Sequence, residues 1–471
     1  MLASGAGSQV LSFITSMWVV RLVARDDFGQ ATNAAIVALS AHAISSFGLG
    51  QYVVVKTRER KDLAFHASIL YLVMGAMAFL GVSLFLGTIA KQTRSPDLAR
   101  YMPGLLLAVS IDRIGTMPER ILVRDQKFRP LALTRAMGEL AYGLSSLLFA
   151  ALGFGGMSVV YGNIVRATLR TAAFVRSAGV REWLTPARLE FAHFRNILAF
   201  SVPLSVSSAL SLIAYRWDNL FVSKFHGPAA AADYNVAFNL ADSPAGVITD
   251  QIGDVLLPSF AKSSQEERGA AFVRALDLLA VVCIPAVIGL GAVSQTFVEV
   301  FFKPQSIGVA PLLFGLSFAF ALKPIAYITV PFLQGSDATG RVLFIAAVNV
   351  VALFAALYSF ARHNLMYVCL AVTVAALVRI AVGLHLANQK SPIPWRAFFL
   401  GQLLPLLCSF LMVGGVLGLR RVWMGAGMGW PVARLVAEIT VGAIVFILSH
   451  ALLAPARTRE FVGMIRNIRK G

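Results

Sequence analysis

Long apolar segments separated by short polar breaks follow one another along almost the whole chain. Each is long enough for the roughly 20 residues with which an α-helix crosses a bilayer. They are continuous runs, unlike the alternating segments of about ten residues that build a membrane β-barrel. The pattern therefore predicts an all-α integral membrane protein with about 14 transmembrane helices. Their expected ranges are 2–22, 29–55, 64–90, 99–121, 131–152, 156–178, 197–223, 230–258, 273–302, 308–333, 341–360, 365–388, 397–419 and 432–454.

Composition supports this class. The 471 residues are 58% hydrophobic and 14% charged, whereas a soluble domain averages about 45–50% apolar and about 25% charged residues. A formal net charge of +18 would favour nucleic-acid binding in a soluble protein. Here the basic residues stand at the ends of apolar runs, so we expect no nucleic-acid partner. The three cysteines fall inside expected spans, and no disulfide framework is indicated.

The distribution of Lys and Arg predicts the orientation of the chain. Dense basic clusters occur at 56–61, 119–129, 176–195 and 465–470. Because basic loops are translocated with difficulty, we expect all four on the cytoplasmic side, which places both termini there. The first segment lacks the basic start of a signal peptide and is expected to be a transmembrane helix. These features predict a multi-pass membrane protein.

The longest connection, 181–195, is amphipathic and is expected to lie on the cytoplasmic surface. It separates two stretches of similar layout, 16–38 and 215–241, each with a helix, a break containing Gly and an aromatic residue near the start of the next helix. This indicates a repeat of six helices. The expected organisation is an N-terminal lobe at 1–180, a linker at 181–196, a C-terminal lobe at 197–390 and two further helices with a basic tail at 391–471.

Two consecutive predicted helices carry a polar face. In helix seven a helical plot places Arg216 and Asp218 on opposite edges of a polar arc, so they cannot easily pair with each other. The arc contains Ser201, Ser205, Ser208, Ser211, Tyr215 and Asn219. In helix eight the polar face contains Asn235, Asn239, Asp242, Gly246, Thr249, Asp250 and Gly253.

Other predicted helices add ionisable groups. One face of helix six carries Asn163, Arg166 and Arg170, and one face of helix four carries Asp112, Thr116 and Glu119; Arg113, Glu139, Lys323 and Arg379 also lie within spans. A charge at the bilayer centre costs at least about 2.5 kcal/mol, so these groups should face protein or a water-filled cavity. The structural alternative is that Ser and Gly faces serve helix packing and that charges near helix ends snorkel.

A basic cavity suits an anionic head group, particularly a phosphate, to which Arg donates two parallel hydrogen bonds. The candidate substrate-binding residues are Arg113, Arg166, Arg170, Arg216, Asn219, Asn235, Asn239 and Lys323. The carboxylates of Asp218 and Asp242 are candidates for binding a coupling proton or sodium ion. No metal-ligand spacing, nucleophile elbow or phosphate-binding glycine motif occurs, so we expect neither catalysis, nor a metal, nor a cofactor beyond the coupling ion.

Four stretches resemble a known family, the polysaccharide and oligosaccharide flippases of the multidrug/oligosaccharidyl-lipid/polysaccharide exporter superfamily. "ERILVRDQKFRPLAL" (119–133) is similar to its basic connection between helices four and five, and "ALGFGGMSVVYGNIVRATLRTAAF" (151–174) to its Gly-Phe-Gly turn and following helix. "RWDNLFVSKFHGPAAAADYNVAFNLA" (216–241) is similar to the entry of its second lobe, and "PFLQGSDATGR" (331–341) to its Gln-Gly turn. The likeness covers about residues 5–390. Asp233, where Gly is expected, and the acidic pair Asp26-Asp27 depart from the pattern at the outer gate.

The resemblance implies two six-helix lobes, related by pseudo-two-fold symmetry around a central cavity, with two added C-terminal helices. It implies a flippase that carries a polyprenyl-diphosphate-linked oligosaccharide across the inner membrane by alternating access, for exopolysaccharide, capsule or O-antigen assembly. The expected partners are this substrate, membrane lipids, and the polysaccharide polymerase and chain-length machinery. Two alternatives stay open: an ion-coupled multidrug antiporter of the same superfamily, which needs an acidic cavity, and a membrane glycan polymerase or transferase, which needs a large outer loop.

Overall fold

A computed structural model describes residues 15, 17–46, 48–57, 61–262, 264–302, 306, 308–336, 338–425 and 429–455. In this part of the chain the elements are α-helices, joined by short turns and a 3-10 helix at Val180–Glu182, and no strand occurs. The predicted all-α class is therefore confirmed. Most of the expected first span, residues 58–60 of the basic cluster at 56–61 and the whole basic tail lie outside the described residues.

Among the described residues, seven helical segments are long and apolar enough to cross a membrane. They are Asp62–Leu84, Glu266–Ala292, Val309–Gly335, Gly340–Phe360, Leu365–Asn388, Trp395–Gly425 and Pro431–Leu453. Their number makes the chain a multi-pass membrane protein. Other helices of similar length carry the polar and ionisable residues found in the sequence, which lower their mean hydropathy.

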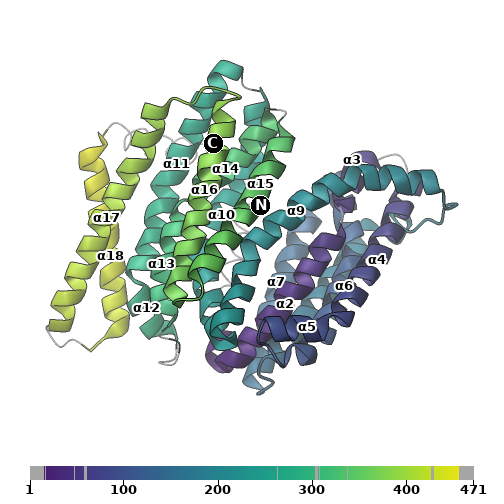
Figure 1. The fold of residues 1–471 in the computed structure, drawn as a ribbon, viewed down its shortest axis with the longest axis horizontal. Coiled ribbons are helices and arrows are strands. Elements are labelled where there is room, and N and C mark those ends of the chain that lie inside the picture. Colours follow the sequence, from purple (N-terminus) through teal and green to yellow (C-terminus); the bar gives the residue numbers. More distant parts are fainter. Residues whose placement is uncertain are drawn as a thin grey trace. The chain divides into compact units, whose positions relative to one another are not determined.

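The chain forms two compact units, Met1–Asn235 and Val236–Gly471. In the first unit α6 packs against α8, α8 against α7, and α2 against α4, α6 and α9. Figure 1 shows these helices in purple to teal. Their bounds are α2 Arg25–Ser46, α3 Leu49–Lys56, α4 Lys61–Leu84, α5 Leu86–Gln92, α6 Leu98–Arg124, α7 Phe128–Ala151, α8 Met157–Ala178 and α9 Phe191–His226.

The second unit begins inside α10, Pro228–Lys262. In it α15 packs against α16, α17 against α18, and α11 against α13 and α17. The remaining bounds are α11 Gln265–Ala292, α12 Ser294–Phe301, α13 Val309–Ala321, α14 Lys323–Gly335, α15 Thr339–Phe360, α16 Leu365–Asn388, α17 Trp395–Gly425 and α18 Pro431–Leu453. Because α9 packs on α2, α3 and α4, it belongs to the first unit. The expected boundary between two six-helix lobes at 181–196 is a statement about an internal repeat, and it stays a prediction.

Four expected spans are each broken into two helices: 29–55 between α2 and α3, 64–90 between α4 and α5, 273–302 between α11 and α12, and 308–333 between α13 and α14. The span at 29–55 divides between α2 and α3, where Gly48 has a left-handed backbone with φ of 58°, a conformation that glycine adopts without a steric penalty. The span at 308–333 divides at Leu322, directly before Lys323 and Pro324 at the start of α14. Proline lacks the N–H that would continue the helical hydrogen bonds of α13. The hydrophobic pattern alone cannot show either of these two breaks, since both sides remain apolar.

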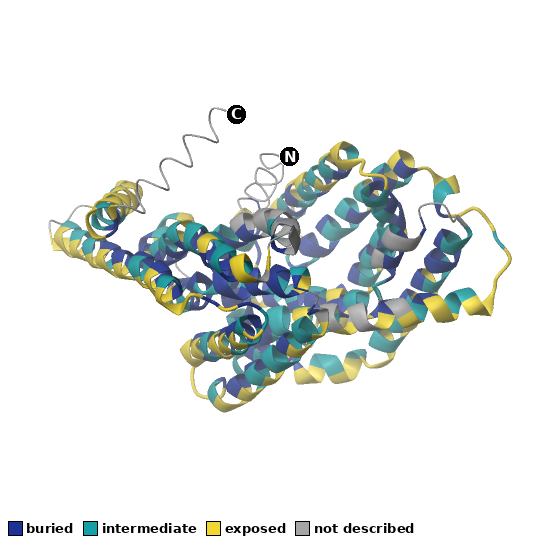
Figure 2. Ribbon diagram, turned by 90° about the horizontal axis from the view of Figure 1, so that it is seen from above, coloured by how far each residue is buried: buried dark blue, intermediate teal, exposed yellow. Residues whose placement is uncertain are grey.

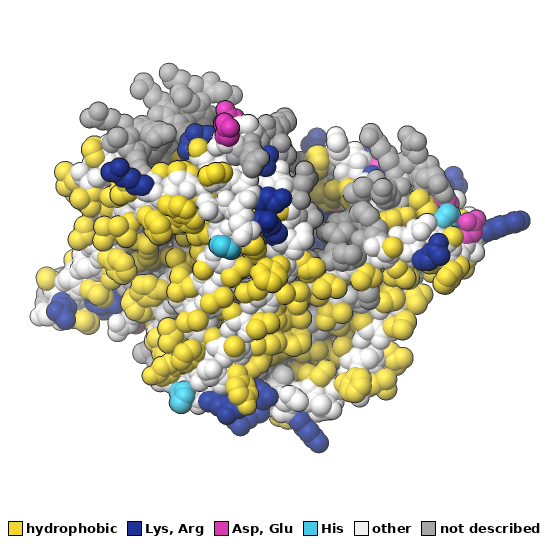
Figure 3. All heavy atoms as spheres, turned by 45° about the horizontal axis from the view of Figure 1, so that its top comes forward, with side chains coloured by type: hydrophobic (Ala, Val, Ile, Leu, Met, Phe, Trp, Pro, Cys, Tyr) yellow, Lys and Arg dark blue, Asp and Glu magenta, His cyan; other side chains and the backbone are white. Residues whose placement is uncertain are grey.

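Large apolar side chains are exposed along the outer helices. On α4 they include Met77, Leu80 and Leu84, and on α17 and α18 they include Phe399, Leu403, Leu407, Val432, Val436 and Ile439. Figure 2 shows exposed positions alternating with buried ones along these helices, and Figure 3 shows broad areas of hydrophobic side chains on the surface. A water-soluble monomer rarely exposes such areas. They are the surface expected where helices meet lipid.

Candidate functional site

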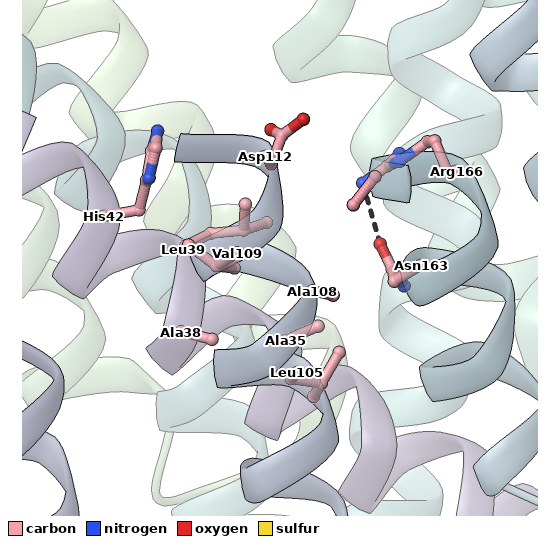
Figure 4. A pocket seen from close by; sticks show the side chains of 11 residues that line it. Ala35, Ala38, Leu39, His42, Leu105, Ala108, Val109, Asp112, Asn163 and Arg166 are labelled. Atoms are coloured by element: carbon pink, nitrogen blue, oxygen red, sulfur yellow. Dashed lines mark hydrogen bonds between the residues drawn. The ribbon is translucent and has the colours of Figure 1, made fainter. Parts of the chain in front are cut away.

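A pocket in the first unit is formed by α2, α6 and α8. Its lining is mostly apolar, and it includes four polar side chains, His42, Asp112, Asn163 and Arg166. Figure 4 shows Asn163 and Arg166 across the pocket from Asp112 and His42. The space measures ≈ 440 Å³, including the part open to the outside. The apolar lining is Ala35, Ala38 and Leu39 from α2, Leu105, Ala108 and Val109 from α6, and Ala167 from α8.

Arg166, which lines this pocket, is held by weak or neutral partners. Its Nη2 donates to Asn163 Oδ1 at 2.7 Å, and its Nη1 lies 3.7 Å from Glu139 Oε1 on α7. The guanidinium carbon is 5.2 Å from the centre of the Tyr142 ring. Because its side chain is 27% exposed, the guanidinium can donate to an anion that enters the pocket.

Arg170, one helical turn further along α8, has a carboxylate partner. Its Nε donates to Asp112 Oδ1 at 3.0 Å, and its Nη2 contacts both carboxylate oxygens. The two side chains are 23% and 26% exposed. Asp112 therefore joins α6 to α8 and neutralises Arg170, while both groups remain reachable from outside.

Arg113 follows Asp112 in the sequence but points away from the pocket. Its side chain enters the space between α2, α4 and α6, where only 2% of the residue is exposed. Nη1 donates to Ser45 Oγ at 2.9 Å, Nη2 to the Ser45 carbonyl at 2.8 Å, and Nε to the Tyr71 carbonyl at 2.8 Å. The guanidinium also lies 4.0 Å from the centre of the Tyr71 ring. The structure does not bring Arg113 together with Arg166, and its contacts favour a structural role.

Buried polar residues of α9 and α10 are joined by hydrogen bonds. Asp218 Oδ2 accepts from the Tyr234 hydroxyl at 2.6 Å, and Oδ1 accepts from the backbone N–H of Asn219 at 2.9 Å and from its amide at 3.2 Å. Asn235 Nδ2 donates to Asn219 Oδ1 at 3.3 Å. All four residues are buried. Arg216, in contrast, lies over the Tyr215 ring at 4.8 Å, so the Asp218 carboxylate is satisfied by neutral donors.

The second unit holds the remaining candidates. Lys323 Nζ donates to Asp242 Oδ1 at 2.6 Å, and the two side chains are partly exposed. The break at Leu322 places Lys323 at the start of α14, from which its amine reaches α10. A Cβ on Gly246 would come within 3.3 Å of this amine, so the small residue leaves room for the pair. Asn239 is exposed on the same helix.

Three contributions to these sites were not identified from the sequence. Tyr142 lies over Arg166, and its position three residues after Glu139 inside a span was an available signal. His42 lines the pocket and was not among the candidate residues. Asp112 was assigned to a polar face, but its pairing with Arg170 depends on how α6 and α8 turn toward each other, which a single helix does not reveal.

Comparison with known proteins agrees with the membrane fold. A family model described as "Polysaccharide biosynthesis protein" matches residues 18–310. The "Succinoglycan biosynthesis transport protein ExoT" of Rhizobium meliloti (strain 1021) is 23% identical over 475 residues, which cover 98% of this chain and 94% of that protein. The "Lipopolysaccharide biosynthesis protein WzxC" of Escherichia coli (strain K12) is 23% identical over 309 residues, which cover 64% of this chain and 62% of that protein.

Solved structures share the fold at low sequence identity. The inward closed conformation of the lipid II flippase MurJ superposes with a TM-score of 0.79 and 14% identity, covering 96% of this chain and 98% of that one. An inward-facing multidrug resistance transporter of the MATE family and MOP superfamily gives a TM-score of 0.65 and 16% identity, covering 81% of this chain and 94% of that one. The fold expected from the family resemblance is thus confirmed at the level of architecture.

Proposed function

Because the chain belongs to the polysaccharide biosynthesis protein family, we propose that it carries a lipid-linked oligosaccharide across the bacterial inner membrane. The observation that carries this proposal is the pocket of the first unit, which Asp112 and Arg166 line, with Arg170 paired to Asp112 beside it. The side chains of both arginines are partly exposed. The names of the relatives, which concern succinoglycan and lipopolysaccharide biosynthesis, support a glycan substrate.

The geometry suits the diphosphate that joins a polyprenol to a glycan. A guanidinium donates two parallel hydrogen bonds to a phosphate, and water is scarce in a membrane pocket, so the attraction is stronger than in bulk solvent. Asn163 adds an amide that can donate to sugar or phosphate oxygens. Arg216, Asn219, Asn235, Asn239 and Lys323 are proposed as further contacts along the path of the substrate, and Asp218 and Asp242 as candidate sites for a coupling ion.

We propose the finer architecture on the same basis. About 14 helices would cross the membrane, as two six-helix lobes with two added C-terminal helices and both termini in the cytoplasm. The lobes would alternate between inward and outward openings, with no covalent chemistry on the substrate. Polysaccharide polymerase and chain-length proteins would receive the translocated glycan.

Replacing Arg166 with alanine tests the proposed site. We expect export of the lipid-linked oligosaccharide to fall by roughly 10- to 100-fold, because a hydrogen bond to a charged group contributes about 1.5–3 kcal/mol. The measurement is the fraction of glycan accessible to a membrane-impermeant label on intact cells. Arg216→Ala provides a second variant on the proposed path.

Arg362→Ala is the matched control, since Arg362 is exposed in the turn between α15 and α16 and contacts the Tyr358 ring. Export should remain at the level of the unaltered protein. Normal export by Arg166→Ala and Arg216→Ala at equal protein level would refute both assignments. Efflux of a cationic dye without glycan export would instead favour the multidrug antiporter, and glycan extension by the purified protein would favour a polymerase.

A further inference from the structure

Ion pairs between the helices of this chain differ in how much of their side chains is exposed. Arg420 on α17 and Glu438 on α18 are 9% and 0% exposed, and Glu438 also accepts from Thr296 at 2.9 Å. Arg170 and Asp112 are paired equally closely but are 23% and 26% exposed. The first pair is inaccessible to a ligand. The second stands beside a pocket, and an anion can therefore compete with Asp112 for the guanidinium.

Asp112 has one close cationic partner among the charged groups that face it. On its own helix, α6, Arg113 is occupied by Ser45 and Tyr71. From α2, His42 faces it, with Nε2 3.4 Å from the hydroxyl of Tyr71 on α4. From α8, Arg170 donates to it directly. The other carboxylates that face Arg170 are Glu119, which pairs with Arg135, and Glu139, which lies near Arg166.

Binding of an anion to Arg170 would leave the Asp112 carboxylate without its cation. The Asp112 side chain is 26% exposed, and a partly desolvated carboxylate that loses its cationic partner becomes less favourable as an ion, which favours uptake of a proton. The site then holds a cationic Arg170, the bound anion and a neutral Asp112 acid, which can donate a hydrogen bond. The charge of the carboxylate is thus replaced by that of the substrate.

We propose that Asp112 is an exchangeable counter-ion, which neutralises Arg170 in the empty pocket and takes up one proton when a diphosphate binds there. The proposal rests on the proposed function, because it assumes that the pocket receives an anionic diphosphate. Asp112 acts through Arg170 and is therefore a positioning residue. Proton uptake by Asp112 makes substrate binding depend on pH. It does not require Asp218, whose carboxylate oxygens accept hydrogen bonds from Tyr234 and Asn219.

Isothermal titration calorimetry of the purified full-length chain tests this directly. The probe is diethyl diphosphate, a diester that keeps two negative charges at neutral pH, so that protons taken up come to the protein and not to the ligand. Titrations at pH 7 in two buffers with different ionisation enthalpies give the number of protons bound per ligand. We expect uptake approaching one proton, and an affinity that rises by up to tenfold per unit fall in pH.

Asp112→Asn should abolish the proton uptake and flatten the pH dependence, while Asp112→Glu, which keeps a carboxylate, should retain both. Glu119→Gln is the matched control on the same helix and should behave like the unaltered chain. Binding without proton uptake, or equal uptake by Asp112→Asn, would overturn the proposed role of Asp112. Absence of any binding by the unaltered chain would contradict the diphosphate site itself, and so the proposed function, together with this inference.

Discussion

Replacing Glu438 with alanine is expected to lower the free energy of unfolding by about 3–5 kcal/mol, the usual cost of leaving one member of a buried ion pair alone. Glu438 accepts from Arg420 Nε at 2.8 Å and Nη2 at 3.1 Å, and from Thr296 Oγ1 at 2.9 Å. The change would leave the Arg420 guanidinium buried without its carboxylate. Since these bonds join α12, α17 and α18, the last two helices should lose their attachment first. Chemical unfolding of the purified protein in detergent measures the effect.

Glu299→Ala is the control, because the Glu299 side chain is 53% exposed on α12, while its partner Arg434 is 11% exposed and lies 4.0 Å from Glu438 Oε1, a second carboxylate that remains in this variant. An exposed ion pair contributes about 0–1 kcal/mol, so little change is expected. The double variant Arg420→Met/Glu438→Leu should recover most of the lost stability, since replacing a buried pair with apolar residues is often close to neutral. Unaltered stability of Glu438→Ala would show that the C-terminal helices are held by lipid-facing packing alone.

The positions of these two helices could be predicted from the sequence, but their attachment was not. The expected spans at 397–419 and 432–454 coincide closely with α17, Trp395–Gly425, and α18, Pro431–Leu453. Hydrophobic length is a local property and was sufficient for that. Glu438 is the only acidic residue within its span, and an ionised carboxylate there was a signal for a buried partner. The partner itself depends on the packing of α17 against α18, which hydropathy does not encode.

In the candidate site, too, the sequence predicts which residues share a helix face but not which residues of a neighbouring helix they contact. A helical plot places Asn163, Arg166 and Arg170 on one face of α8, and this face does meet α6 at the pocket. The plot cannot say which cation remains open to a ligand, because that depends on the neighbouring helix. Arg170 faces a carboxylate of α6 at bonding distance, whereas Arg166 faces an amide and a more distant carboxylate. The different functions proposed for Arg166 and Arg170 rest on this contrast.

Arg113 is the candidate whose proposed role changes most between sequence and structure. Consecutive residues of a helix point about 100° apart, so Asp112 can face the pocket while Arg113 faces α2 and α4. Ser45 lies in the last turn of α2, where the helix provides no N–H for its carbonyl. Arg113 donates to that carbonyl at 2.8 Å directly before the break at Gly48. It therefore closes the end of α2 from a neighbouring helix, and its one described contact with a residue that lines the pocket is between Nη1 and His42 Nδ1, 3.5 Å apart.

We expect Arg113→Ala to lower the free energy of unfolding by about 2–5 kcal/mol, as truncation of large buried side chains does, because the Ser45 carbonyl also loses its donor. Gly75→Ala is an independent variant, since a Cβ there would lie 2.1 Å from Arg113 Nε and must displace the guanidinium without removing it. Arg166→Ala is the comparison. Because the Arg166 side chain is partly exposed, its removal should change the free energy of unfolding by no more than about 1 kcal/mol, but it should weaken the binding of diethyl diphosphate. Chemical unfolding and calorimetry on the three variants separate the two roles. If Arg113→Ala is stable but fails to bind the diphosphate, Arg113 contributes to the substrate site. If Arg113→Ala and Gly75→Ala are both destabilised, the role of Arg113 at the end of α2 is supported.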